Sequence, residues 1–232
     1  MPESDVSMGR GGNSLPRSSA VALTLTVVLI GVYIALDIVA QLLPPHYSPI
    51  TQAESDLAVG PFGFVMTANF VVRGVLSLSF IYGLTQATAL ARRTRLGVGL
   101  LGAWGVGAFI LAASPTDVGT GSPTLHGTIH LVVASIAFLA GAIGELLLAR
   151  NFTAEERLAV FQNPAVVLAI LATIFCLVTF AATGAPRLVH GAFGLVERIF
   201  IGLVLLWMLL VSLFLLRDHS PSARGDPPAT HA

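Results

Sequence analysis

The sequence predicts an all-α, polytopic membrane protein with six transmembrane helices arranged as three antiparallel hairpins. Composition gives the first reason: of the 232 residues, 55% are hydrophobic and 10% are charged, whereas about 25% of the residues in a soluble domain are charged. The second reason is the mean hydropathy of +0.85, which is that of a predominantly apolar chain. The third reason is that several apolar runs approach or exceed the roughly 20 residues that a helix needs to cross a bilayer.

Six such runs can be followed along the chain. They extend over Ala20–Leu43, Phe62–Leu90, Leu96–Ala113, His126–Ala149, Ala165–Thr183 and Val189–Leu216. The first run is too long for the core of a signal peptide, and no cleavage site of the A-x-A type follows it promptly, so we interpret it as a retained anchor. The flanking segments 1–19 and 217–232 are polar and rich in Gly, Ser and Pro. We expect both to be disordered, which leaves residues 20–216 as the membrane domain.

The arginines predict the orientation of these helices. All twelve basic residues are arginines, and nine of them fall in segments that lie on one side of the membrane, namely Arg10, Arg17, Arg92, Arg93, Arg95, Arg150, Arg157, Arg217 and Arg224. The segments on the other side contain one, Arg187. By the positive-inside rule we expect both termini to be cytoplasmic, in a protein of the plasma membrane. The loops 44–61, 114–125 and 184–188 then face outward.

A short motif occurs twice at the outer side. Thr120–Gly127 reads TGSPTLHG and Thr183–Gly191 reads TGAPRLVHG. Each copy ends at the start of an inward-running helix and places a histidine in its first turn. We therefore predict that the second and third hairpins form an internal repeat, of which the first hairpin shows no clear copy.

Ionisable residues inside the apolar runs predict a polar centre. They are Asp37, Arg73, Glu197 and Arg198, together with His126, His130, His190 and Glu145. Such groups in hydrocarbon mark a packed interior, a cavity or a pathway. Arg73 lies about 16 Å into its run, and Glu197 and Arg198 are expected at a similar depth near the bilayer middle. Apart from Glu145, these residues gather in the outer half.

The helical period arranges these residues into stripes that face the interior. The three stripes are Asn69–Arg73–Ser77, His126–His130–Ala134–Ala137–Gly141–Glu145, and His190–Gly194–Glu197. Residues three or four apart share one face of a helix. The small residues of the second stripe permit close contact between helices in a membrane, so this histidine face should point into the bundle.

The outer loops add acidic residues above this centre. Thr51 and Glu54 have the spacing of a capping box, which predicts a short helix from Thr51 to about Val59. This helix would carry Glu54 and Asp56 over the mouth of the bundle. Asp117 lies in a turn-prone segment of the next outer loop.

An ordered set of motifs resembles a known family. The motifs are S-P-x-x-x-x-x-S-D at Ser48–Asp56, P-T-D at Pro115–Asp117, H-G-x-x-H at His126–His130 and G-L-x-E-R at Gly194–Arg198. Together they resemble the domain of unknown function 998 family, a group of six-helix integral membrane proteins from bacteria and archaea. The resemblance covers roughly residues 20–216. It implies the same fold and topology and suggests that the family shares these polar residues, but it implies no established activity.

The function therefore stays open between several hypotheses, and the sequence does not decide whether the protein is an enzyme. In a structural role, Arg73 with Glu197, or Arg198 with Asp37, would lock helices together. In a metal-dependent hydrolase acting on lipid at the outer leaflet, a zinc ion would be held by His126, His130 and His190. Glu54, Asp56 or Asp117 would then serve as fourth ligand or base. H-x-x-x-H without a following Glu in the motif is a weak indication of zinc.

A third hypothesis is a transporter of a small solute, a lipid or protons. A charged pair of Arg73 and Glu197 beneath titratable histidines would form its site, although the sequence shows neither an inverted repeat nor a broken helix. Haem held between His130 and His190 is the least favoured alternative. The expected partners are membrane lipid and a second copy of the chain, packed through the glycine-rich segment Leu96–Phe109. The net charge of zero gives no reason to expect nucleic acid.

Overall fold

The computed structural model describes residues 15–89, 92, 94–119, 121–189 and 191–217. In this part of the chain the regular elements are helices, as predicted. Six long ones are α1 (Arg17–Leu42), α2 (Gly63–Ala87), α4 (Arg95–Ala113), α5 (Leu125–Ala149), α7 (Gln162–Gly184) and α8 (Phe193–Arg217). Four short ones are η1 (Glu54–Ala58), η2 (Phe152–Ala154), α6 (Glu156–Ala159) and η3 (Pro186–Val189). All six long helices are long and apolar enough to cross a membrane, and a helix satisfies its backbone polar groups without water. The predicted all-α, six-span fold is confirmed.

Most helix ends lie within three residues of the predicted ones, with one informative exception. The last span was expected to begin at Val189, but α8 begins at Phe193. The preceding residues form η3, and Gly191 then has a φ of 81°, which ends the regular backbone before α8 begins. Glu197 therefore lies about 6 Å below the start of α8. The expectation that it lies near the bilayer middle was wrong.

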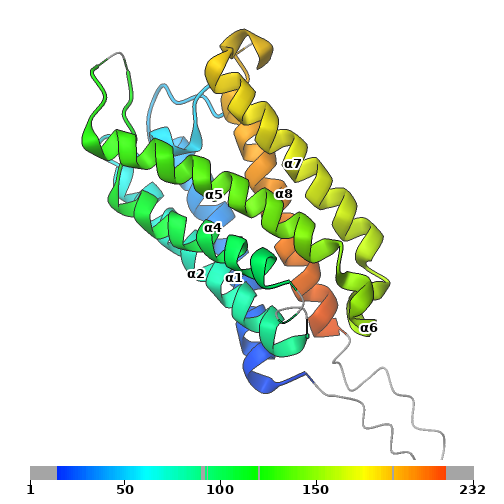
Figure 1. Ribbon diagram of the computed structural model, residues 1–232. Coiled ribbons are helices and arrows are strands. Elements are labelled where there is room, and N and C mark those ends of the chain that lie inside the picture. The colour runs from blue at the N-terminus through cyan, green and yellow to red at the C-terminus, as the bar shows by residue number, and fades with distance from the viewer. Residues whose placement is uncertain (1–14, 90–91, 93, 120, 190, 218–232) are drawn as a thin grey trace, which may run out of the picture.

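The six long helices form one bundle (Figure 1). Going around it, α1 packs against α2, α2 against α4, α4 against α5, α5 against α7, α7 against α8, and α8 returns to α1. We call residues 43–62 the strap. The end of the bundle at which these residues lie is called the strap end. The α4–α5 connection and η3 lie at this same end. The start of α1, the end of α8 and α6 lie at the opposite end, which we call the terminal end.

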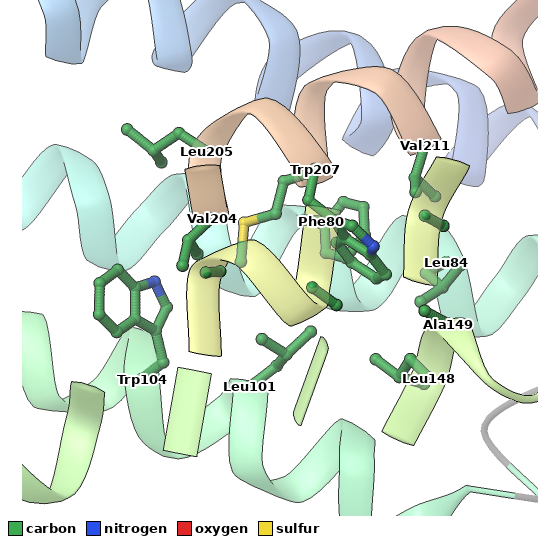
Figure 2. Close-up of a cluster of buried hydrophobic side chains, with 14 of the residues drawn as sticks. Phe80, Leu84, Leu101, Trp104, Leu148, Ala149, Val204, Leu205, Trp207 and Val211 are labelled. Carbon is green, nitrogen blue, oxygen red and sulfur yellow. The ribbon is translucent and has the colours of Figure 1, made fainter. Parts of the chain in front are cut away.

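The terminal half of the bundle has a dense apolar core. The ring of Trp207 contacts that of Phe80 edge-on at 5.6 Å and stacks on that of Phe152 at 5.7 Å. Figure 2 shows Trp207 and Phe80 among buried aliphatic side chains such as Leu84 and Leu148. Aromatic pairs at such distances are favourable beyond the area that they bury. This half therefore supplies a large part of the apolar packing and fixes the helices that lead to the strap end.

Small residues allow the helices to approach closely. A Cβ on Gly141 would lie 2.9 Å from the Trp104 ring, and one on Gly107 would lie 2.9 Å from the Cβ of Ala137. The small-residue face of α5 thus points into the bundle, as predicted. On α4, by contrast, Gly99 and Gly102 have nothing within 4 Å of an added Cβ. A dimer through this open face of α4 stays a prediction.

Candidate functional site

The strap is fastened to the first turns of α8. The Leu195 amide donates a hydrogen bond to the Ile50 carbonyl at 3.0 Å. Next to it, a Cβ on Gly194 would lie 2.0 Å from the carbonyl oxygen of Gln52, so the strap backbone runs directly over this glycine. A residue with a side chain would push the two segments apart. The motifs Ser48–Asp56 and Gly194–Arg198 therefore meet in space.

Arg198 completes this attachment. Its Nη1 donates to the carbonyls of Pro49 (3.1 Å), Gln52 (3.1 Å) and Gly194 (3.2 Å). Its Nη2 donates to the hydroxyl of Tyr47, whose ring also lies 5.5 Å from the guanidinium carbon. Backbone carbonyls in an irregular segment need donors when water is excluded. Arg198 supplies them, so it acts as the anchor of the strap.

η1 inserts Glu54 into the bundle. The side chain is 3% exposed, its carboxylate accepts a hydrogen bond from the Tyr33 hydroxyl, and its backbone amide donates to Glu197 Oε2 at 2.7 Å. The predicted capping box is wrong. Because the Glu54 carboxylate faces Tyr33 and does not reach back to Thr51, the element is a 3₁₀ helix that begins only at Glu54 and has no side-chain cap.

A second attachment joins the α4–α5 connection to the start of α5. Asp117 accepts hydrogen bonds from the Thr124 amide (2.8 Å) and hydroxyl (2.7 Å), and the Thr124 hydroxyl oxygen accepts from the Gly127 amide (3.0 Å). A Cβ on Gly127 would lie 2.0 Å from Asp117 Oδ2. The bonds from Thr124 hold the pKa of Asp117 below its usual value. Asp117 was a candidate base or metal ligand in the sequence. In the structure it stabilises the N-terminus of α5.

The three predicted zinc ligands differ in their surroundings. His130 is buried, and its Nδ1 lies 2.7 Å from the Ser114 carbonyl oxygen, to which it donates. His126 is exposed, because it lies in the first turn of α5. His190 lies outside the described residues. Among the residues that are described, no group of three or more His, Cys, Asp or Glu side chains is placed to hold a metal ion. The zinc site, which includes His190, stays a prediction.

A cavity of about 200 Å³ lies beneath the strap, between η1, α2, α5, α7 and α8. Its ionisable wall residues are Glu54, Asp56, Arg73, His130 and Glu197. All five were singled out from the sequence, and they are contributed by segments far apart along the chain. The apolar remainder of the wall includes Phe70, Phe138 and Ile201. The cavity therefore has a mixed polar and apolar lining.

Arg73 is the cation in this wall. It is 1% exposed, and its Nε and Nη2 atoms are buried without a hydrogen-bond partner in the described part of the chain. Its guanidinium carbon lies 5.1 Å from the centre of the Phe70 ring and 4.8 Å from that of the Trp104 ring. The aromatic rings hold the guanidinium in place by cation–π attraction. They leave its hydrogen-bonding capacity largely unused.

The other members of the predicted polar set lie close by. Asn69 and Ser77 are fully buried on the same face of α2 as Arg73, and the Oδ1 of Asn69 also has no partner among the described residues. Asp37 accepts from Gln41 at 2.5 Å. Within the described segments the hydrogen bonds of Arg198 therefore go to the strap and to its own helix, and those of Asp37 go to α1.

Burial changes the acidity of two carboxyl groups in the strap. It raises the pKa of Glu54, and the nearby charge of Asp37 raises this pKa further, while Arg73 lowers it. Burial likewise raises the pKa of Asp56. Both groups keep a proton to a higher pH than a carboxyl group in water does. The strap therefore brings two carboxyl groups with raised pKa values to the wall of the cavity.

Three residues of the site were missed in the sequence. Tyr33 lies four residues before Asp37 on the same face of α1, and this spacing is a pattern that would have revealed it. Tyr47 directly precedes the Ser48–Asp56 motif. Trp104 has no polar neighbour in the sequence, and its contact with Arg73 depends on how α4 packs against α2.

Comparison with known proteins gives one match. The model of a family described as "Protein of unknown function (DUF998)" matches residues 19–213. Neither a curated protein nor a solved structure matches the chain. The description of this family assigns no activity, and the features of the chain that bear on function are the cavity and the residues around it.

Proposed function

This chain belongs to the family of proteins of unknown function DUF998, and we propose, from the geometry of the cavity, that it binds a small organic anion together with a proton. Membership confirms the resemblance that the four motifs indicated. The activity itself is our inference, and the following observations on the cavity support it.

The unused hydrogen-bond donors of Arg73 carry the proposal. A buried guanidinium group without partners is costly, and buried polar groups in native proteins are nearly always hydrogen-bonded. Arg73 borders the cavity, and two of its nitrogens lack partners in the described residues. Guanidinium groups match carboxylates and phosphates in geometry and charge. An anion in the cavity would give Arg73 the partner that the protein does not provide.

The acidic residues supply the link to protons. When Glu54 is protonated, the positive charge of Arg73 is less compensated and attracts an anion more strongly. When Glu54 is ionised, its negative charge competes with that anion. The raised pKa of Glu54 favours the protonated form, so affinity for the anion should rise as the pH falls. By reciprocity the bound anion raises the affinity of the site for the proton.

The size and lining of the cavity limit the ligand. About 200 Å³ is below the range of roughly 300–1,000 Å³ that is typical of sites for drug-sized ligands. Phe70, Leu111, Phe138 and Ile201 form apolar parts of the wall. These features favour a monovalent anion with a short apolar tail, such as a short-chain carboxylate. We infer from the arginine bias that the strap end faces outward, so the ligand would enter from outside the cell.

Calorimetric titration of the purified protein with hexanoate tests the proposal. The change is Arg73→Met, which removes the charge but keeps a long side chain. One hydrogen bond to a charged group contributes about 1.5–3 kcal/mol, so we expect the affinity to fall by roughly tenfold to a hundredfold. In the unchanged protein, affinity should be higher at about pH 5.5 than at about pH 7.5. In Glu54→Gln this difference should shrink, because the amide cannot ionise.

Arg187→Met is the matched control, because Arg187 is exposed in η3 and does not border the cavity. It should bind hexanoate as the unchanged protein does. Equal affinity in folded Arg73→Met and in this control would refute the anion site. Stoichiometric zinc in the purified protein, lost in His130→Ala, would instead favour the hydrolase hypothesis and overturn the proposal.

A further inference from the structure

A second hollow lies on the side of the bundle, between α1 and α8. It has a volume of about 320 Å³, and its apolar lining is formed by Ile30, Ile34, Leu205, Leu206 and Leu209. Of these side chains, Ile34 is 49% exposed and Leu206 is 39% exposed. The hollow is therefore a groove that opens outward from the bundle, at a level where the six apolar spans indicate lipid. We call it the α1–α8 groove.

The groove extends along α8, and we expect its strap-side end to lie near the membrane surface. Along α8 its lining extends from Arg198 to Leu209, a rise of about 16 Å. α1 is 26 residues long, or about 39 Å, so when centred on a hydrocarbon core of about 30 Å it extends beyond the core at both ends. Asp37 lies five residues before Leu42, the last residue of α1. This places it only a few ångströms, roughly 3 Å, below the hydrocarbon boundary.

The strap-side end of the groove carries both signs of charge. Asp37 and Arg198 line it there. Asp37 Oδ1 and Arg198 Nε are buried and have no hydrogen-bond partner among the described residues, although the other oxygen of Asp37 accepts from Gln41. One acceptor of a negatively charged group and one donor of a positively charged group thus lack a partner within the described residues at this end of the groove.

We propose that the α1–α8 groove binds one phospholipid with a zwitterionic, amine-bearing headgroup of the phosphatidylethanolamine type. The ammonium group lies at Asp37, the phosphate lies at Arg198, and one acyl chain follows the aliphatic side chains of α8 inward. An anionic headgroup fits less well, because Asp37 and Glu54 both line the same end of the groove. This site is distinct from the anion site, although Glu54 and Ile201 border both spaces.

Competition between two lipids tests the headgroup assignment. The purified full-length protein is delipidated in detergent and incubated with equal amounts of phosphatidylethanolamine and phosphatidylglycerol that have the same acyl chains. Retained lipid is then counted by native mass spectrometry. We expect phosphatidylethanolamine to be retained roughly tenfold over phosphatidylglycerol, as for one hydrogen bond to a charged group. Asp37→Asn, which keeps the shape and removes the charge, should lower this preference.

Filling the groove tests its location. Gly202 lines the groove and has nothing within 4 Å of an added Cβ, so Gly202→Leu should place its side chain in the groove. Gly102→Leu is the matched control, since Gly102 on α4 also has open space. Lipid retention should be lost in Gly202→Leu and kept in Gly102→Leu, whereas hexanoate binding should be kept in both. Equal retention in the two variants, or equal retention of the two lipids by the unchanged protein, would overturn the proposal.

Discussion

Two arginines lie in the strap-end half of the bundle, Arg73 buried and Arg198 partly buried, and their surroundings differ sharply. Arg198 has hydrogen bonds to three backbone carbonyls and to one tyrosine hydroxyl. Arg73 lies against two aromatic rings, and two of its nitrogens have no partner in the described residues. The comparison teaches that a charge within an apolar helix can have either of two roles. Arg198 holds the strap, whereas Arg73 has two donors without a partner in the described residues, and we propose that these bind a ligand.

The cause of this difference is the strap. The carbonyls of Pro49 and Gln52 belong to an irregular segment and cannot be satisfied by a helix, so they attract the donors of Arg198. Within the described residues, Nε and Nη2 of Arg73 have no such acceptor, and the neighbouring rings of Phe70 and Trp104 offer π faces instead. The two arginines therefore diverge through contacts with residues far away in the sequence.

The largest expected effect compares the same substitution at both arginines. Arg198→Met leaves several buried carbonyls without a donor, and we expect it to lower the free energy of unfolding by about 3 kcal/mol. Arg73→Met loses cation–π contacts but also removes a poorly paired buried charge. Its effect should stay within about 1 kcal/mol. Thermal unfolding in detergent measures both, and protease cleavage within residues 43–62 should increase only in Arg198→Met.

Equal destabilisation by the two substitutions would remove the distinction between anchor and binding residue. It would mean that Arg73, too, has a mainly structural role.

An intermediate effect is expected where the strap passes over α8. Gly194→Ala places a Cβ 2.0 Å from the Gln52 carbonyl oxygen, and overpacking of this kind costs about 1–3 kcal/mol. Gly202→Ala, two turns further along α8, has open space around it. It should be neutral or stabilising, because alanine favours helices over glycine by up to about 1 kcal/mol. Melting temperatures of the two variants in detergent test the difference, and similar values would show that the strap yields easily.

The smallest expected effect is a pH dependence. The pKa of Glu54 is raised above its usual value of 4.5, so the folded state holds this proton more tightly than the unfolded state. The resulting stability is fully present below pH 4.5 and is lost as the pH rises through the folded-state pKa. Glu54→Gln should flatten the decrease in melting temperature between about pH 5 and about pH 8.

Asp117 serves as the counterpart, because its pKa is lowered from 3.8 and its contribution is lost in the opposite direction, as the pH falls. Asp117→Asn should leave the decrease in melting temperature above about pH 5 unchanged. If the melting temperature of Glu54→Gln decreased with rising pH as much as that of the unchanged protein, groups other than Glu54 would be its cause.

Several parts of the site could be read from the sequence because they depend on local spacing. The stripe Asn69–Arg73–Ser77 is buried as one face of α2, and Glu54 and Asp56 do lie over the bundle. Other expectations failed because they needed distant partners. Thr51 and Glu54 have capping-box spacing, yet Tyr33 in α1 takes the Glu54 side chain. The capping-box rule considers residues three apart, so it does not include a partner 21 residues away in the sequence.

The repeated motif shows the same limit. Both copies end in a His-Gly pair, but the two glycines have different roles. Gly127 lies within α5, where Asp117 leaves no room for a Cβ. Gly191 has a φ of 81° and lies before α8. Sequence similarity alone could not distinguish these two roles of glycine. The internal repeat of the second and third hairpins stays a prediction.

The sequence by itself determined the six apolar helices, because a helix that satisfies its own backbone and is apolar over about 20 residues needs no further information to be recognised. It also indicated the buried polar face of α2, because the helical period places Asn69, Arg73 and Ser77 on one side of the helix. Only the tertiary structure decided what these residues do. Hydrogen bonds act over about 3 Å, and the strap brings together residues almost 150 positions apart, such as Pro49 and Arg198. That contact separates the anchoring arginine from the one that faces the cavity.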